Sequence, residues 1–346
     1  MRKAYLYTLL TVAAWAIGPV GSKALLLARG PGPPLRPLQV AFWAIAAGWV
    51  CLLALLAARG RLARLRDFPG RGWAVLVAMG FFGWAGYAGS LNFALARLPL
   101  PEAVIVNYLH PVFTVIFQGA GFGVVIRLLS GWEKAPDRSA SPRWWRVALG
   151  LVLCLAGVAV VATGGSLATL GRSLSPALRQ APALAGVLAA LFAAFSWGVY
   201  SNLGRFVRVK EGREASGLAD VQTFAAMTFG LVMLGGALSA GGQLVAPVGY
   251  RASLFFLNSG PAEVNAWLVI AAMGFVLYCS GFRLWLHALE LGGLAGAPHK
   301  LPPLTYLTPV LSVALGWVVL RQPFTAGFWW GAALIATGNA VNLWRR

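Results

Sequence analysis

The chain consists of long apolar stretches separated by short polar connections that are rich in arginine. The hydrocarbon core of a bilayer is ~30 Å thick and an α-helix rises ~1.5 Å per residue, so a spanning helix needs about 20 apolar residues. The pattern therefore predicts an all-α polytopic membrane protein. Ten stretches meet the required length, at 4–27, 38–58, 73–95, 102–125, 145–163, 182–203, 218–240, 265–287, 301–320 and 325–344.

Composition excludes the main alternatives to a membrane protein. Hydrophobic residues make up 59% of the chain and charged residues only 11%, whereas a soluble domain carries about a quarter charged residues. A disordered chain lacks such apolar mass. The three cysteines are an odd number and lie in apolar stretches, which does not fit a secreted disulfide scaffold. The net charge of +19 does not indicate nucleic acid as a partner, because the basic residues punctuate apolar stretches.

The distribution of basic residues predicts the orientation in the membrane. If the N-terminus is cytoplasmic, 19 of the 28 Lys and Arg fall on the cytoplasmic side and seven on the opposite side. The other two, Lys23 and Arg283, lie within apolar stretches. This asymmetry agrees with the positive-inside rule and places both termini in the cytoplasm. The excess of Arg over Lys, with abundant Ala, Gly and Leu, is typical of a GC-rich bacterium, so we expect a bacterial inner membrane.

Several sequence blocks occur twice, in the same order. We therefore expect two halves, 1–165 and 180–346, of five spans each. Because five is odd, the second half enters the membrane from the opposite side, which is the inverted-repeat architecture of secondary transporters that work by alternating access. The repeated blocks are Ala78–Phe81 with Ala272–Phe275, Tyr108–Val112 with Tyr306–Val310, Gly150 and Gly157 with Gly331 and Gly338, and Trp15, Lys23, Phe42 and Gly48 with Trp197, Arg205, Phe224 and Gly230.

These blocks resemble the drug/metabolite transporter superfamily in its EamA-type ten-helix form, over essentially the whole chain. The matching features are a Trp in the first span of each half, Tyr-Leu-x-Pro-Val in the fourth and Gly-x6-Gly in the fifth. The segments 107–111, 308–312 and 328–332 are most similar to the aromatic amino-acid exporter branch. The resemblance implies a central cavity between the halves and export of small metabolites driven by an ion or substrate gradient. His110 replaces the usual aromatic of that branch, and the connection 292–303 is longer.

Two prolines in corresponding spans, Pro111 and Pro309, predict helix kinks. A proline inside a helix leaves the carbonyl four residues earlier without its partner, and in lipid such a carbonyl must find another partner or face a polar cavity. Packing alone is the alternative explanation. Because polar residues accompany both prolines, we expect them to line the substrate path: Asn107, Tyr108 and His110 in the first half, Thr305 and Tyr306 in the second.

A second candidate group is confined to the second half. Arg283, His287 and Glu290 are spaced by four and three residues and so share one helix face. Ionisable groups at membrane depth are candidate substrate-binding or proton-coupling groups. The alternative is that Arg283 extends to the lipid headgroups. His287 and Glu290 also have metal-ligand spacing, but without a second such pair we expect no metal site.

Aromatic residues form the third group of expected substrate-binding positions. Aromatic walls suit flat, apolar or cationic solutes through stacking and cation–π contacts, although Trp and Tyr are also common packing and interfacial residues. The candidates are Trp15, Tyr87, Trp197, Tyr200 and Tyr278. Lys23, close to the outer end of the first span, is either a headgroup anchor or, alternatively, a gate residue or a contact for an anionic substrate.

No motif indicates an enzyme. The chain has no Gly-x-Ser-x-Gly, no His-Glu-x-x-His and no Walker glycine loop, so we expect neither catalysis nor a cofactor. The expected partners are a small-molecule substrate, the lipid bilayer and a coupling proton or other ion, with the chain a monomer or homodimer. A lipid flippase and a structural membrane subunit remain the alternative functions, and a passive channel fits less well because no charged ring or carbonyl filter is recognisable.

Overall fold

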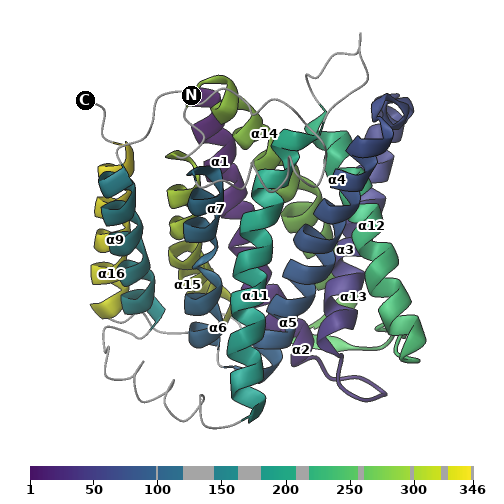
Figure 1. The fold of residues 1–346 in the computed structure, drawn as a ribbon. Coiled ribbons are helices and arrows are strands. Elements are labelled where there is room, and N and C mark those ends of the chain that lie inside the picture. The colour runs from purple at the N-terminus through teal and green to yellow at the C-terminus, as the bar shows by residue number, and fades with distance from the viewer. Residues whose placement is uncertain are drawn as a thin grey trace.

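The computed structural model describes residues 1–98, 100–119, 144–162, 181–207, 218–255, 261–296, 300–320 and 326–343. Its helices run side by side in one bundle, and α1 begins at the same end of the bundle at which α16 ends (Figure 1). The described part of residues 1–165 contains α1 (Arg2–Trp15), α2 (Ile17–Leu26), α3 (Pro37–Ala58), the 3-10 helix η1 (Leu62–Asp67), α4 (Gly70–Gly80), the π-helix η2 (Phe81–Gly86), α5 (Tyr87–Arg97), α6 (Leu100–Asn107), α7 (His110–Gly119) and α9 (Trp144–Ala162).

The described part of residues 180–346 contains a similar series of helices and a two-stranded hairpin. Its elements are α11 (Ala181–Leu203), the 3-10 helix η3 (Gly204–Phe206), α12 (Ala219–Ala240), β1 (Arg251–Phe255), β2 (Pro261–Asn265), α13 (Ala266–Ala272), the π-helix η4 (Met273–Gly281), α14 (Phe282–Leu294), the 3-10 helix η6 (Pro302–Tyr306), α15 (Leu307–Leu320) and α16 (Ala326–Leu343).

The predicted polytopic membrane protein is confirmed. Six helical runs in the described residues are long and apolar enough to cross a bilayer. The expected stretches at 102–125, 145–163, 301–320 and 325–344 also contain helices, which are shorter or interrupted, so the count of ten spans stays a prediction. The six runs are Arg2–Leu26, Pro37–Ala58, Gly70–Arg97, Pro182–Leu203, Ala219–Ala240 and Ala266–Leu294.

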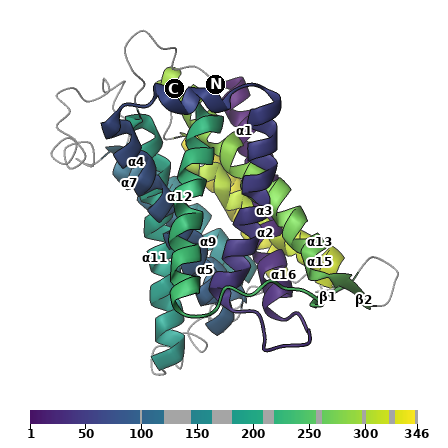
Figure 2. The same ribbon diagram turned by 90° about the vertical axis from the view of Figure 1, so that its right-hand side faces the viewer.

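The expectation of an all-α chain missed a two-stranded antiparallel sheet. Its register runs from Arg251 opposite Asn265 to Phe255 opposite Pro261, and it lies at the end of the bundle away from the N-terminus (Figure 2). Arg29, in the connection before α3, exchanges two backbone hydrogen bonds with Arg251. The strands are five residues long, too short to register in an analysis of hydrophobic stretches of spanning length.

The helices α3 and α12 match closely, although they lie in different halves of the sequence. They begin at residues 37 and 219 and end at residues 58 and 240, a constant separation of 182. Each is followed by a glycine in the left-handed region, Gly60 with φ +62° and Gly242 with φ +63°. In both turns the next N–H donates to a carbonyl five residues earlier, from Arg61 to Leu56 and from Gln243 to Leu238, which is the hydrogen bond of the Schellman motif, a common glycine-terminated helix end.

Small residues bring the backbones of neighbouring helices together at corresponding places. A Cβ added to Gly48 of α3 would lie 2.7 Å from the carbonyl oxygen of Gly274. A Cβ added to Gly230 of α12 would lie 3.0 Å from the carbonyl oxygen of Gly80. In the repeat alignment Gly48 corresponds to Gly230 and Gly80 to Gly274, so one contact maps onto the other. Close approach at small residues is a typical way for helices to pack in a membrane.

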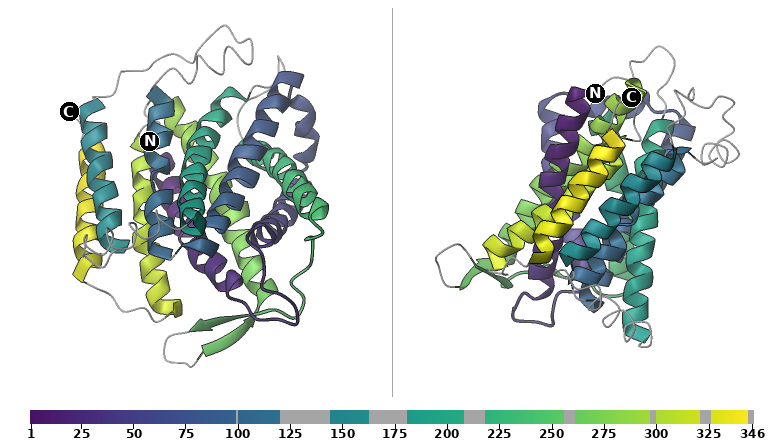
Figure 3. Two further views of the ribbon diagram at one scale, coloured as in Figure 1. Left: turned by 60° about the horizontal axis from the view of Figure 1, so that its bottom comes forward. Right: turned by 90° about the vertical axis from the view of Figure 1, so that its left-hand side faces the viewer.

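Two glycine contacts that map onto each other also occur between α9 and α16, which lie side by side at one edge of the bundle (Figure 1; Figure 3). A Cβ on Gly157 would lie 2.6 Å from the Gly331 carbonyl oxygen, and one on Gly338 would lie 2.6 Å from that of Gly150. The earlier residue of one helix meets the later residue of the other, so the two helices are antiparallel.

Candidate functional site

A pocket lies between α1 and α2, α5, the α6–α7 segment, and η4 with α14. Residues from both halves of the chain contribute to it. Its lining consists of Trp15, Gly18, Pro19, Ser22, Tyr87, Ala88, Leu91, Asn92, Asn107, Tyr108, His110, Leu277, Tyr278 and Phe282.

Irregular helical backbone surrounds the pocket. Helix α6 ends at Asn107 and α7 begins at His110, with a turn between them. The π-helical segment η4 supplies Leu277 and Tyr278. Non-helical backbone at membrane depth is tolerated where it is buried in protein or lines a cavity, and π-helical turns occur frequently at functional sites.

The predicted kinks at the two prolines are interruptions of the helix in this structure. Pro111 is the second residue of α7, a position where its missing N–H removes no intrahelical bond. Pro309 is the third residue of α15 and follows the 3-10 helix η6. Both prolines therefore lie in the first turn of an α-helix that follows an interruption of the α-helical backbone.

Three of the five predicted aromatic residues line the pocket: Trp15, Tyr87 and Tyr278. Trp197 lies behind them, with its ring centroid 4.7 Å from that of Trp15 and 4.8 Å from that of Tyr87. Tyr200 is fully buried and is not part of the lining. Both residues support the wall from behind.

The predicted polar residues of the first half, Asn107, Tyr108 and His110, all line the pocket. Their counterparts in the second half do not. The Thr305 hydroxyl donates to the Pro302 carbonyl at 2.7 Å, and Tyr306 is buried with its ring centroid 6.4 Å from that of Tyr108. The polar part of the pocket is thus asymmetric.

Two polar lining residues, Ser22 and Asn92, were not predicted. The Asn92 amide nitrogen donates to the Ala88 carbonyl at 2.8 Å, while its Oδ1 has no partner within the described residues. The same is true of Asn107 Oδ1 and His110 Nδ1. A buried polar atom without a partner is unusual and calls for an explanation. The sequence signal for Asn92 was an amide within an apolar stretch.

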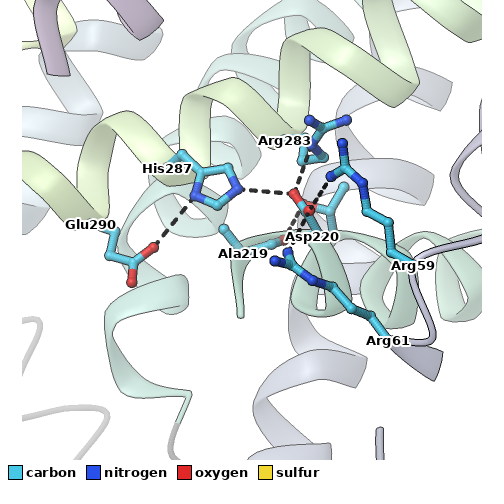
Figure 4. A network of polar contacts seen from close by, with 8 residues as sticks. Arg59, Arg61, Ala219, Asp220, Arg283, His287 and Glu290 are labelled. Carbon is cyan, nitrogen blue, oxygen red and sulfur yellow. Dashed lines mark hydrogen bonds and ion pairs between the residues drawn. The ribbon is translucent and has the colours of Figure 1, made fainter. Parts of the chain in front are cut away.

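Arg283 and His287 do not line the pocket but lie around Asp220, at the start of α12 (Figure 4). Arg283 Nε lies 2.7 Å and His287 Nε2 2.9 Å from Asp220 Oδ1. The Asp220 side chain is only 2% exposed. His287 Nδ1 also lies 3.6 Å from Glu290 Oε2, as the spacing on the helix predicted.

The Asp220 network, which we define as Asp220 with its basic neighbours and Glu290, also joins the two halves of the chain. Arg59 and Arg61, in the turn after α3, place their Nη1 atoms 3.6 and 3.3 Å from Asp220 Oδ2. Burial of a carboxylate is costly unless charged partners compensate it. Asp220 was not singled out from the sequence as a partner of these residues. An acidic residue in the first turn of an apolar helix was the available signal.

Lys23 reaches neither the pocket lining nor the Asp220 network. Its Nζ donates to the Leu95 carbonyl oxygen at 3.0 Å, in the last turn of α5. The last carbonyls of a helix have no intrahelical partner, and a cation there also interacts favourably with the helix dipole. Lys23 therefore connects the ends of the first and third spans.

The chain is similar to known membrane transporters. The model of the EamA-like transporter family matches residues 2–131 and 184–344. The aromatic amino acid exporter YddG of Salmonella typhimurium (strain 14028s / SGSC 2262) is 25% identical over 98% of this chain and 96% of its own length. The exporter of the same name from Escherichia coli (strain K12) is 24% identical over 73% of this chain and 70% of its own length.

A solved structure described only as "Crystal structure of protein" has the same fold. It superposes with a TM-score of 0.64 at 24% sequence identity, over 99% of this chain and 97% of the other. The resemblance inferred from the repeated motifs is confirmed, and the chain belongs to the EamA-like transporter family.

Proposed function

We propose that the protein is a secondary transporter that exports small amphipathic metabolites, amino acids among them, across the bacterial inner membrane by alternating access. The observation that carries this proposal is the pocket within the bundle, lined by aromatic rings and unpartnered polar atoms. Family membership and two relatives named as aromatic amino acid exporters support it. We propose neither an enzymatic activity nor a bound cofactor for this protein.

The proposed architecture is ten transmembrane helices in two inverted halves, 1–165 and 180–346, with both termini in the cytoplasm. The exchange of glycine contacts supports it, because contacts that map onto each other arise from a two-fold relationship between the halves. The antiparallel packing of α9 against α16 supports an axis perpendicular to the helices. Such an axis lies in the membrane plane, as in other transporters with inverted repeats.

We place the closure of the cytoplasmic end at the Asp220 network. Arg283 and His287, expected to bind substrate, then act on the gate through Asp220. The corresponding place at the other end of the bundle is apolar. Leu38 corresponds to Asp220 and Gly89 to Arg283, and a Cβ on Gly89 would lie 3.1 Å from Leu38 Cδ2. The charged network therefore occurs only at the cytoplasmic end of the described bundle. It stabilises the state that is closed to the cytoplasm relative to the state that is open to it.

Counterflow in proteoliposomes tests the proposal. Purified protein is reconstituted into vesicles that contain unlabelled phenylalanine, and uptake of labelled phenylalanine is followed. A carrier shows uptake that unlabelled internal substrate stimulates. A channel, a lipid flippase or a structural subunit shows no such stimulation, and that result would contradict the proposal. Repeating the assay with imposed proton and sodium gradients identifies the coupling ion.

A further inference from the structure

The lining of the pocket carries no counter-charge. Neither Asp, Glu, Lys nor Arg is among the lining residues in the described part of the chain. Lys23 donates to a backbone carbonyl, and Arg283 pairs with Asp220. Any charged group of a solute bound in the pocket must therefore be stabilised by neutral dipoles.

This absence of charge restricts the solutes that bind well. Moving a net charge out of water into an apolar site is costly unless an opposite charge or several hydrogen bonds compensate it. A zwitterion has no net charge, and properly oriented dipoles can compensate its two ends. A solute with one unpaired charge has no partner of opposite sign among the lining residues.

The break between α6 and α7 supplies dipoles of both signs at neighbouring positions. The C-terminal end of α6, at Asn107, carries partial negative charge, and the N-terminal end of α7, at His110, carries partial positive charge. Both residues line the pocket. The ends of a discontinuous helix are an established way for transporters to bind the charged groups of a substrate.

Unpartnered side-chain atoms accompany the two helix ends. Asn107 and His110 are 5% and 3% exposed, and Asn107 Oδ1 and His110 Nδ1 have no partner within the described residues. Asn92 Oδ1, in a residue that is 2% exposed, is a further unpartnered acceptor of the lining. The two amide oxygens suit an ammonium group, since each can accept a hydrogen bond.

We propose that the pocket recognises the zwitterionic head of a free amino acid at the α6–α7 break. The ammonium group binds at the end of α6, near Asn107 and Asn92. The carboxylate binds at the start of α7, near His110. The side chain of the amino acid then packs against Tyr278 and Phe282, which lie on the lining. This inference rests on the proposed transport function and names its substrate class.

The competing arrangement is an organic cation held by the aromatic wall alone, through cation–π contacts. The two arrangements differ in the effect of removing one charge from the ligand. Phenylalanine amide keeps the ammonium group and loses the carboxylate. N-acetylphenylalanine keeps the carboxylate and loses the ammonium. Both retain the aromatic side chain.

Binding of these three compounds to the purified full chain in detergent tests the inference, with thermal shift and intrinsic tryptophan fluorescence as readouts. We expect phenylalanine to bind at least about tenfold more tightly than either derivative, a difference that one lost charge-assisted interaction accounts for. Equal or tighter binding of the amide would overturn the inference in favour of the cation arrangement.

Matched variants show whether the named residues carry the selectivity. Asn92→Leu and Asn107→Leu should weaken phenylalanine binding about tenfold and reduce the preference over the derivatives. The control is Asn339→Leu on α16, because Asn339 is also buried, donates to the carbonyl four residues earlier, at Ile335, and has an unpartnered Oδ1. Loss of binding in Asn339→Leu equal to that in Asn92→Leu would contradict the assignment.

The same experiments separate this inference from the function on which it rests. Counterflow of phenylalanine together with equal binding of the three compounds would leave the transport function standing and overturn only the zwitterion site. Absence of both counterflow and binding for every compound would overturn the two together. Counterflow with the expected order of affinities supports both.

Discussion

Trp15 and Trp197, which occupy corresponding positions 182 residues apart, pack edge to face with their ring centroids 4.7 Å apart. A residue that contacts its own counterpart lies near the axis that relates two copies. Tyr108 and Tyr306, another corresponding pair, have ring centroids 6.4 Å apart. The pocket is lined by the first member of each pair, so the candidate site lies beside the proposed axis.

Removal of the buried indole at the centre should destabilise the protein strongly. Trp197 is 1% exposed and contacts Trp15, Tyr87 and His110. We expect Trp197→Ala to lower the free energy of unfolding by about 3–5 kcal/mol, the usual cost of deleting a large core aromatic. Thermal unfolding in detergent measures the change. Trp330→Ala, at a residue that is 71% exposed, is the control and should leave the melting temperature nearly unchanged.

The close helix contacts predict that added methyl groups are tolerated unequally. Gly48→Ala and Gly230→Ala should each cost about 1–3 kcal/mol, because the new Cβ meets backbone of the neighbouring helix. Gly236→Ala, in the same helix as Gly230, has nothing within 4 Å of its new Cβ and should be neutral or slightly stabilising. Similar melting temperatures for Gly230→Ala and Gly236→Ala would contradict the packing described.

Loss of the charge on Asp220 should open the cytoplasmic end. Asp220→Asn leaves Arg283, Arg59 and Arg61 without their buried partner, and breaking a buried pair is strongly destabilising. We expect faster modification of pocket cysteines, such as Ser22→Cys, by reagents applied from the cytoplasmic side. Glu263→Gln breaks a surface pair with Arg251 whose side chains are 65% and 59% exposed, and such a pair contributes little. This control should leave the modification rate unchanged.

His110 and Arg283 should affect transport in different ways. His110 lines the pocket, whereas Arg283 pairs with Asp220. Both His110→Ala and Arg283→Ala should lower transport without reducing membrane insertion. We expect His110→Ala to weaken substrate binding, and Arg283→Ala to leave binding nearly intact while changing access from the cytoplasm. Wild-type transport rates in the purified, folded variants would contradict the assigned roles.

Sequence alone predicted the elements whose signal is local. The apolar stretches gave the helical runs at residues 2–26, 37–58, 70–97, 182–203, 219–240 and 266–294, because hydrophobic length is read directly from the chain. The prolines marked the interruptions before α7 and α15, because a proline inside a helix removes a backbone hydrogen bond and clashes with the preceding turn. The glycines at the close helix contacts were visible in the sequence as repeated positions, but which glycines contact each other was not predicted.

Features that depend on distant residues could not be predicted in this way. Arg283 and His287 share the partner Asp220, which is more than sixty residues away in sequence. Tyr200, Thr305 and Tyr306 have the chemistry of pocket residues, yet they are buried away from the lining. Residue type and spacing place a side chain on a helix face, but the packing of neighbouring helices decides what that face contacts.

The inverted relationship of the halves is tested most directly at Ala58 and Ala240, the exposed last residues of α3 and α12. Each is replaced singly by cysteine in a background without Cys51, Cys154 and Cys279, and intact cells are treated with a membrane-impermeant maleimide. We predict labelling of Ala240→Cys in intact cells, and of Ala58→Cys only after permeabilisation. Labelling of both from the same side would contradict the inverted architecture.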